Sequence, residues 1–394
     1  MKEEKILQSV PVSIVRGGTS KAIFIEEKNL PRDHNERDNL ILSIFGSPDV
    51  RQIDGLGGAD VLTSKLGIIG ASTRTDADID YVFGQVSIDK PMIDYRGNCG
   101  NISAAVGIFA INKGYIHIKK NEEISTVRIH MKNTGRILTV FIPVYNSFCC
   151  IEGDYSIDGV PGTGPKIDMD WADCGGDTTG NLLPTGNVRD IIKVNGQIFD
   201  VSIVDAGNLV VFINADALGI IGNEYPENIY SNRDLMNIIE IIRGKAAEKI
   251  GLIDDFEKSI DMSPYIPFVS IVSPSSHFIS LNGNNFLKNN SDITSRLIFM
   301  QNVHKAHPVS ATIALSVASL IPGSVVNSQL IKSKNFLRIS HPSGIISIET
   351  CLKKVNNQFK LKKSLISRTA RIILDGTVYI SSNTMKQKAL LRKI

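Results

Sequence analysis

The sequence has few cysteines, few aromatic residues and little net charge. Its five cysteines in 394 residues include the adjacent Cys149 and Cys150 and form no Cys-x-x-Cys pair. This count excludes a disulfide scaffold and argues against a structural zinc site. Aromatic residues make up 6%, too few for a platform that stacks bases. With 43 Lys and Arg against 40 Asp and Glu, the net charge of +3 argues against a strongly basic nucleic-acid binder.

Long hydrophobic runs are also missing. No stretch reaches about 18 uninterrupted apolar residues, so no transmembrane helix is predicted. The segment Met1 to Lys5 mixes charges of both signs before a short apolar run, which is unlike a signal peptide. We therefore expect a soluble cytoplasmic protein in a reducing compartment, with neither a membrane nor a nucleic acid as its partner.

What the sequence does contain is an internal repeat. The length alone predicts two or three domains. Val12-Ser-Ile-Val15, followed by Arg16-Gly-Gly-Thr-Ser20, recurs 189 residues later as Val201-Ser-Ile-Val204, followed by Asp205-Ala-Gly-Asn208. Both copies have the pattern of a strand, a glycine turn and another strand.

A second pair of segments supports the repeat. A helix rich in small residues is predicted over 101–110 and again over 310–319, and each is followed by a strand that contains Arg-Ile, at 127–130 and 337–340. Two β-rich domains could share such patterns by chance, but two pairs in the same order favour a duplication.

The fold class that follows is α+β, with two similar halves made mostly of strands. One long helix is predicted near 232–249. Pro and Gly in Leu183-Pro-Thr-Gly-Asn187 break the pattern between the halves. We predict a first half over 1–185, completed by the C-terminal segment 368–394, and a second half over 186–367.

The strongest candidate for chemistry is Arg96-Gly-Asn-Cys-Gly-Asn101, between a predicted strand and the first small-residue helix. Here Cys99 would lie at a helix N-terminus, where free backbone N–H groups and the helix dipole favour a thiolate or a substrate carboxylate. The alternative is a buried structural cysteine in a turn. The sequence alone leaves both interpretations open.

The second candidate is Asp54-Gly-Leu-Gly-Gly58 with the following Thr63-Ser-Lys65. Glycines beside a lysine can bind an anion, and a partly buried lysine can act as a base because its pKa is lowered. The alternative, which the local sequence alone favours, is a flexible turn with Lys65 exposed to solvent. The run does not match a Walker motif.

Two further segments are weaker candidates. In Arg16-Gly-Gly-Thr-Ser20 the hydroxyls of Thr19 and Ser20 could face a carboxylate, or the segment could be a plain hairpin turn. His304-Lys-Ala-His-Pro-Val-Ser310 precedes the second small-residue helix, but no third ligand lies near its two histidines. We therefore predict no metal site here.

Taken in order, these motifs resemble the PrpF family, and the resemblance covers essentially the whole chain. That family includes 2-methylaconitate cis-trans isomerase, 3-methylitaconate delta-isomerase and 4-oxalomesaconate tautomerase. The matching runs are Arg16-Gly-Gly-Thr-Ser-Lys21, Gly46-Ser-Pro-Asp-Val-Arg-Gln-Ile-Asp-Gly-Leu-Gly-Gly-Ala59, Thr63-Ser-Lys65, Asp76-Ala-Asp-Ile-Asp-Tyr81, Gly97-Asn-Cys-Gly-Asn-Ile-Ser103, Asp158-Gly-Val-Pro-Gly-Thr163, Leu183-Pro-Thr-Gly-Asn187, Ile321-Pro-Gly323 and Arg368-Thr-Ala-Arg371.

The resemblance implies a fold similar to diaminopimelate epimerase. Each half would be a sheet or barrel around a central helix, with the active site in the cleft between the halves. In the epimerases both central helices carry a cysteine, whereas the second helix here begins near His307-Pro-Val-Ser310. The run Ser310-Ala-Thr312 also departs from the Thr-Gly-Ala that is usual in the family.

The activity that the resemblance implies is a cofactor-free allylic proton shift in a small unsaturated di- or tricarboxylate. Lys65 would be the base, or the acid on return, and Cys99 the second proton-transfer group or a positioning group. The carboxylates would be held by Thr19, Ser20, Asn98, Gly100, Asn101, Ser310 and Ala311. The alternatives are an amino-acid racemase or epimerase and a non-catalytic carboxylate-binding protein. Whether the chain forms a homo-oligomer stays open.

Overall fold

The computed structural model describes residues 7–356 and 358–381, and the chain divides into two compact units. The first unit contains residues 1–155, 163–167 and 368–394, and the second contains 156–162 and 168–367. Of the predicted C-terminal segment, the described residues 368–381 group with the first unit, and residues 382–394 lie outside the described part. Residues 168–185 belong to the second unit, and the predicted boundary between the repeated halves stays a prediction.

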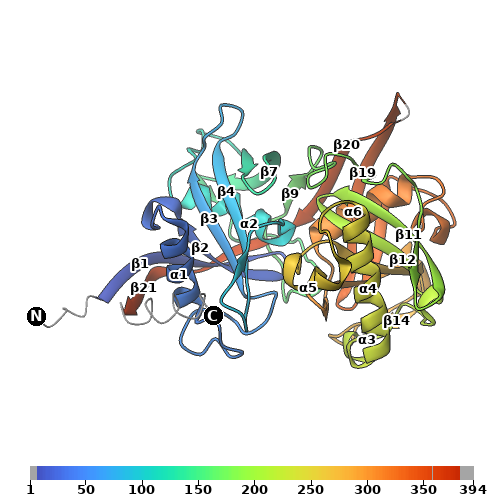
Figure 1. Cartoon of the computed structure of the whole chain (residues 1–394). Coiled ribbons are helices and arrows are strands. Elements are labelled where there is room, and N and C mark those ends of the chain that lie inside the picture. The colour runs from blue at the N-terminus through green and yellow to red at the C-terminus, as the bar shows by residue number, and fades with distance from the viewer. Residues whose placement is uncertain (1–6, 357, 382–394) are drawn as a thin grey trace, which may run out of the picture. The chain divides into compact units, whose positions relative to one another are not determined.

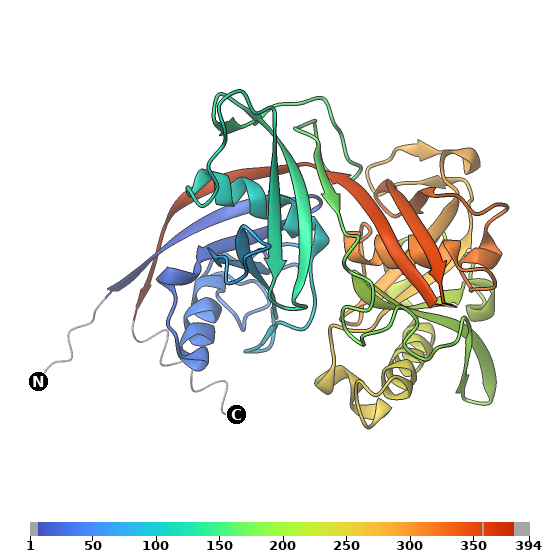
Figure 2. The same ribbon diagram turned by 90° about the horizontal axis from the view of Figure 1, so that it is seen from above.

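The first unit is built from strands around one buried helix. Its strands are β1 (Leu7–Gly17), β2 (Ser20–Glu26), β3 (Lys65–Ala71), β4 (Ile79–Val86), β5 (Ile93–Asp94), β6 (Ile124–Met131), β7 (Arg136–Tyr145), β8 (Phe148–Cys149) and β21 (Ala370–Ser381). Its helices are α1 (His34–Phe45), α2 (Gly100–Asn112) and the short 3-10 helix η1 (Glu27–Asn29). Strand β1 runs antiparallel to both β2 and β21, and Figures 1 and 2 show β1 in blue beside β21 in red.

Helix α2 is the centre of the first unit. Its residues from Gly100 to Ala110 are all buried, because small and apolar side chains alternate along it without a charged residue. It packs against β1, β21 and β7. The neighbouring strand β6 alternates between exposed and buried residues, as its sequence pattern predicts for a strand with one face on the core.

The second unit contains the remaining elements. Its strands are β9 (Ile167–Asp170), β10 (Asp190–Val194), β11 (Gln197–Ala206), β12 (Asn208–Asn214), β13 (Phe268–Pro274), β14 (Phe278–Ile279), β15 (Asn285–Phe286), β16 (Ile293–Phe299), β17 (Asn302–Val303), β18 (Phe336–His341), β19 (Gly344–Val355) and β20 (Gln358–Arg368). The first residue of β9 and the last of β20 belong to the first unit. Its helices are α3 (Pro226–Ser231), α4 (Arg233–Lys249), α5 (Ser259–Met262), α6 (Val309–Leu320) and the 3-10 helices η2 (Asp216–Leu218), η3 (Phe256–Lys258), η4 (Lys288–Asn290) and η5 (Asn327–Gln329).

The two units have the same strand pairing, which confirms the predicted repeat. In the first, β2 is parallel to β3, β3 antiparallel to β4, β4 parallel to β6 and β6 antiparallel to β7. In the second, β12, β13, β16, β18 and β19 follow each other in the same alternation. Helices α2 and α6 occupy equivalent places in this order. The fold is therefore α+β, with two repeated halves that each surround a helix.

An ion pair repeats together with the strands. In the first unit Asp78, just before β4, accepts from the backbone N–H of Arg128 at 2.8 Å and pairs with its guanidinium at 2.6 Å. In the second unit Asp292, just before β16, accepts from the backbone N–H of Arg338 at 2.9 Å and pairs with its guanidinium at 3.1 Å. Both arginines belong to the predicted Arg-Ile strands, so the repeat extends to side-chain contacts.

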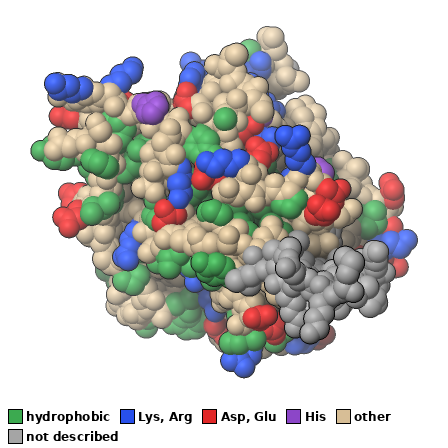
Figure 3. Space-filling model, turned by 90° about the vertical axis from the view of Figure 1, so that its left-hand side faces the viewer, with side chains coloured by type: hydrophobic (Ala, Val, Ile, Leu, Met, Phe, Trp, Pro, Cys, Tyr) green, Lys and Arg blue, Asp and Glu red, His purple; other side chains and the backbone are tan. Residues whose placement is uncertain are grey.

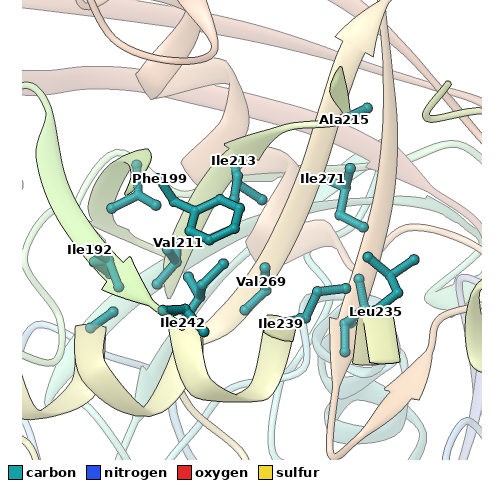
Figure 4. Packing of buried hydrophobic residues seen from close by; sticks show 14 of the residues in the cluster. Ile192, Phe199, Val211, Ile213, Ala215, Leu235, Ile239, Ile242, Val269 and Ile271 are labelled. Carbon is teal, nitrogen blue, oxygen red and sulfur yellow. The ribbon is translucent and has the colours of Figure 1, made fainter. Parts of the chain in front are cut away.

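The core of the second unit lies between its sheet and α4. The predicted helix over 232–249 is confirmed by α4, which spans Arg233–Lys249. Asn232 caps this helix by accepting from the N–H of Leu235. One face of α4 packs Ile239 and Ile242 against Val211 and Val269 of the sheet (Figure 4). On the other side of the sheet, α6 contacts β11, β12 and β19.

The distribution of charged side chains on the surface agrees with the small net charge of the chain. On the face shown in Figure 3, basic and acidic side chains are interspersed over the atoms that are not grey. Among the described helices, none is both long and apolar enough to span a membrane.

Candidate active site

The first part of the candidate site is the turn between β1 and β2. It is a hairpin in which Gly17 pairs with Ser20, and Gly18 has a φ of +50° that favours glycine. The turn lies against the start of α2, because a Cβ at Gly17 would be 2.3 Å from the backbone oxygen of Asn101. Both glycines are therefore required for the close approach of the turn to the helix. The segment is therefore the hairpin turn that one interpretation predicts, and the contact of the Thr19 and Ser20 hydroxyls with a carboxylate stays a prediction.

The second part is the N-terminus of α2. Cys99 is its N-cap residue, is 8% exposed, and makes no side-chain capping hydrogen bond. The backbone N–H of Ser103 donates to the oxygen of Cys99 at 2.9 Å. The N–H groups of Gly100, Asn101 and Ile102 precede this bond, so they have no partner within the helix and can bind an anion. The predicted position of Cys99 at a helix N-terminus is confirmed.

The carboxamide of Asn101 links the helix to the turn. Its Nδ2 donates to Oγ1 of Thr19 at 3.1 Å, and its Oδ1 accepts from Nε of Arg368 at 3.1 Å. Asn101 is 2% exposed and Arg368 is 6% exposed, whereas Thr19 is half-buried. The structure thus brings two predicted residues, Thr19 and Asn101, into direct contact, and places beside Asn101 an arginine that the sequence analysis did not assign.

The third part is Lys65, the first residue of β3. It is 3% exposed, so the interpretation of this lysine as a solvated side chain after a flexible turn is wrong. The physical reason is its position at the start of a strand that is buried from Lys65 to Gly70. Its Nζ donates to Oε1 of Gln85 at 2.6 Å and lies 5.5 Å from the centre of the Phe83 ring. Both partners are on the antiparallel neighbour β4.

Gln85 holds the lysine in a defined orientation. Its Nε2 donates to the backbone oxygens of Val61 and Ser64, at 3.2 and 3.1 Å, so its oxygen must face the lysine. Gln52 organises the same loop, since its Nε2 donates to the hydroxyls of Ser47 and Ser64 and its oxygen accepts from another backbone N–H of the loop. The glycine-rich segment before Lys65 is therefore an ordered loop, built around two buried glutamines.

Lys65 and Cys99 are coupled electrostatically. Burial lowers the pKa of Lys65, while the Cys99 sulfur and the Asp60 carboxylate act in the opposite direction. A lysine of lowered pKa has a larger neutral fraction near pH 7, and the neutral amine is the form that accepts a proton. Burial thus favours the form of Lys65 that can accept a proton, while the catalytic roles of Lys65 and Cys99 stay a prediction.

The other predicted residues of the first unit lie in the hairpin turn or next to Cys99 in the chain. Ser20 is 3% exposed at the end of the hairpin, and Asn98, whose Nδ2 is 3.4 Å from Oγ1 of Thr134, is fully buried. Gly100 is the first residue of α2. All of them belong to the same compact unit as Lys65 and Cys99.

Ser310 and Ala311 lie in the second unit, in the first turn of α6. There Nδ2 of Asn208 donates to Oγ of Ser310 at 3.0 Å, and a Cβ at Gly207 would be 3.1 Å from the Ser310 backbone oxygen. This contact between turn and helix is equivalent to that of Thr19 and Asn101. The role of Ser310 and Ala311 as substrate contacts stays a prediction.

The acid–base pair itself is not repeated. The first residue of β13, the strand equivalent to β3, is Phe268, and the N-cap of α6 is Pro308. Neither of these two residues can transfer a proton. The catalytic candidates therefore belong to one half of the repeat, as the missing second cysteine predicts.

The histidines near α6 make internal hydrogen bonds. Thr312 donates its hydroxyl to the oxygen of Pro308, so Nδ1 of His307 donates to Thr312 at 2.8 Å, and Nε2 is 3.0 Å from Oγ of Ser295. Nδ1 of His304 accepts from a backbone N–H at 3.0 Å. Over residues 7–356 and 358–381, no group of three His, Cys, Asp or Glu side chains is arranged to hold a metal ion.

Sequence reasoning missed Gln85, Phe83 and Arg368 as parts of the site. Gln85 faces Lys65 only through the register of β3 and β4, which a single sequence does not specify. Arg368 reaches Asn101 across a separation of 267 residues. The run Arg368-Thr-Ala-Arg371 does belong to the motifs of the resemblance, which is the one signal that could have drawn attention to it.

Comparison with known proteins gives consistent matches over nearly the whole chain. The model of the PrpF protein family matches residues 7–381. The chain is 44% identical to the 3-methylitaconate isomerase of Eubacterium barkeri, over 94% of this chain and 97% of that protein. It is 34% identical to the 2-methyl-aconitate isomerase of Shewanella oneidensis, over 94% and 96%.

Solved structures show the same fold. A crystal structure of methylitaconate-delta-isomerase superposes with a TM-score of 0.79 at 42% identity, over 96% of this chain and 97% of that one. A hydroxyproline epimerase from Agrobacterium vitis superposes with a TM-score of 0.56 at 10% identity, over 97% and 94%. At that identity the epimerase shows the likeness of the fold alone.

Proposed function

The chain belongs to the PrpF family and is an isomerase, and we propose that it moves an allylic proton in a small unsaturated dicarboxylate of the 3-methylitaconate type. The observation that carries this proposal is the buried pair of Lys65 and Cys99 beside the first turn of α2. A proton shift needs a base, an acid and a site for the developing negative charge, and these residues offer all three.

In the first step the neutral amine of Lys65 takes a proton from the carbon next to the double bond. The C–H bond breaks, and its electron pair spreads over the double bond and a carboxylate to give a dienolate. In the second step the Cys99 thiol gives its proton to the far carbon of the dienolate, which forms the new C–H bond. The lysine ammonium then returns its proton to the thiolate, so the enzyme is unchanged and one double bond has moved.

The carboxylates of the substrate would be held by groups of the first unit. The N–H groups of Gly100 and Asn101 point out of the helix N-terminus, where the dipole favours negative charge. Thr19, Ser20 and Asn98 supply neutral side-chain donors from the adjoining segments. Such donors stabilise the charge of the dienolate without a further proton transfer.

Two observations favour this activity over a racemase. A racemase must protonate its substrate from either of two faces. In the other half of the repeat, the equivalents of Lys65 and Cys99 are Phe268 and Pro308, which cannot transfer a proton, so that half supplies no second acid–base pair at these positions. The 44% identity is to an isomerase, whereas the epimerase shares only the fold. A non-catalytic binding protein would have no need of a buried lysine coupled to a thiol.

The test is exchange of substrate protons with solvent deuterium, followed by NMR with purified protein and 3-methylitaconate. We expect exchange and a shifted double bond with the unaltered chain, and loss of at least 100-fold with Lys65→Ala, since general acid–base catalysis contributes about 10²–10⁴-fold. Cys99→Ser should be slowed, whereas Cys174→Ser, which alters a buried thiol of the second unit, should not. Full exchange by Lys65→Ala would refute the assignment of the base.

The cysteines bear on where in the cell the enzyme acts. A catalytic thiol must stay reduced, and all five cysteines are free. We therefore propose that the chain acts in the cytoplasm on a free metabolite.

A further inference from the structure

The strongest unassigned feature is the buried guanidinium of Arg368 beside the turn and α2. Its Nε donates to Oδ1 of Asn101 at 3.1 Å. Burial lowers the pKa of Arg368 to about 10, so the side chain stays cationic at neutral pH. An arginine has five N–H donors and no acceptor, so only the oxygen of the Asn101 carboxamide can face it.

This constraint fixes the rest of the contact. With its oxygen turned to the arginine, the carboxamide must turn Nδ2 to the other side, where it lies 3.1 Å from Oγ1 of Thr19. Thr19 therefore accepts this hydrogen bond. The only proton of its hydroxyl is not used on Asn101, and among the residues that the structure describes it is donated to no side chain or backbone oxygen.

The backbone holds the arginine in place. The oxygen of Thr369, the next residue, accepts from the N–H of Gly18 at 2.9 Å and from Nη1 of Arg16 at 2.8 Å. At Gly18, a Cβ would lie 2.1 Å from Oδ1 of Asn101 and 3.1 Å from Cδ of Arg368. The turn, the helix and the end of β20 are thus packed closely around the carboxamide of Asn101.

We propose that Arg368 is a positioning residue that orients the chain of hydrogen bonds from Arg368 through Asn101 to Thr19, so that the Thr19 hydroxyl is left to donate to a substrate carboxylate. Asn101 passes the direction of these hydrogen bonds from Arg368 to Thr19, and Arg368 acts without touching the substrate. This inference rests on the proposed function, because it assigns a carboxylate to Thr19. In the second unit the bond between turn and helix runs the other way, because the amide of Asn208 in the turn donates to the hydroxyl of Ser310 in α6.

The role predicts a coupling between two distant substitutions. Thr19→Val removes the hydroxyl and should weaken the binding of 3-methylitaconate about 10-fold to 100-fold, as expected for a hydrogen bond to a charged group. Arg368→Met releases the carboxamide, so that the Thr19 hydroxyl can turn to Oδ1 of Asn101 instead of the substrate. In the Arg368→Met background, Thr19→Val should therefore cost less than about threefold.

The experiment is a double-mutant cycle on Arg368→Met and Thr19→Val, read as Kd by calorimetry and as KM and kcat by proton exchange. We expect each substitution to raise Kd and KM more than it lowers kcat, and Arg368→Lys to recover part of the affinity. Arg371→Met removes a nearby exposed arginine and should leave these constants unchanged. Thermal unfolding of every variant identifies any that fail to fold.

The outcomes separate the two proposals. Full additivity in an active enzyme would overturn the positioning role and would indicate that the guanidinium itself binds a carboxylate. Absence of coupling with unchanged Kd in Arg368→Met would overturn it as well. Binding without exchange in the unaltered chain would refute the isomerase mechanism, while the cycle on Kd would still judge Arg368. A chain that neither binds nor exchanges would overturn both proposals.

Discussion

The contact between Lys65 and Gln85 offers the sharpest test of the catalytic base. Gln85→Met keeps the length of the side chain and removes the oxygen that lies 2.6 Å from Nζ. A hydrogen bond to a charged group contributes roughly 1.5–3 kcal/mol, against about 0.5–1.5 kcal/mol for a neutral one. The ammonium therefore loses about 1–1.5 kcal/mol more than the amine does, which lowers the pKa of Lys65 by about one further unit.

The sign of the effect on catalysis follows from the role of the base. If the neutral amine takes the proton, kcat/KM rises with pH through the pKa of Lys65 in the free enzyme. Gln85→Met lowers that pKa, so the acid limb of the profile should move to lower pH by about one unit. The assay is the rate of proton exchange with 3-methylitaconate between pH 5 and 9, on the order of ten points for each variant.

The matched control is Gln52→Met. Gln52 is as buried as Gln85 and organises the same loop, but its carboxamide donates to the hydroxyls of Ser47 and Ser64 and accepts from the backbone N–H of Ala59. It should cost a similar amount of stability, about 1–3 kcal/mol for the groups that lose a partner, and leave the acid limb in place. An acid limb that stays fixed in Gln85→Met, or moves equally in both variants, would show that Lys65 is not the titrating base. Titration of Lys65 by NMR of labelled lysine gives the same pKa without turnover.

Two further predictions concern the frame of the site. Gly18→Ala should destabilise the chain by roughly 2–4 kcal/mol and weaken substrate binding, because the residue has a φ of +50° and its Cβ would lie 2.1 Å from Oδ1 of Asn101. The control is Gly162→Ala, which should cost only about 1 kcal/mol because Gly162 has a φ of +76° and open space around it. Equal unfolding midpoints for the two variants would contradict this prediction. Burial alone would raise the pKa of Asp292, but the hydrogen bonds and charges of Arg338 and Lys334 lower it to about 2. Its ion pairs therefore stabilise the fold above about pH 4, and their contribution is lost as the pH falls towards 2. The difference in unfolding free energy between the unaltered chain and Asp292→Asn should shrink over that range in urea titrations, and a constant difference would refute the assignment.

Much of the architecture could be predicted because it is written in local patterns. The glycine turns at Gly18 and Gly207, the alternation in β6 and the capped helix α4 each depend on residues within a few positions of each other. The repeat was visible for the same reason, since two copies of one local pattern occur in the same order. Cys99 at the start of α2 was predictable in position, because a small-residue helix after Gly-Asn-Cys-Gly has few places to begin.

The site was only partly predictable, because burial and register are not local. Lys65 looked exposed after a glycine-rich loop, and it is buried because β3 pairs with both β2 and β4. The orientation of its ammonium depends on Gln85, twenty residues away, and that of Asn101 depends on Arg368. The helical or strand periodicity of the sequence relates neighbouring residues and does not predict contacts between residues so far apart in the chain.

The sequence by itself determined the two α+β halves, the turn and helix that carry Thr19 and Cys99, and the absence of a second catalytic cysteine. The tertiary structure alone decided that Lys65 is buried and coupled to Cys99, and that Arg368 turns the Asn101 carboxamide. The physical reason is that strands and turns follow from short-range conformational preference. The pKa of a lysine and the direction of a hydrogen bond instead follow from which distant groups exclude water around them.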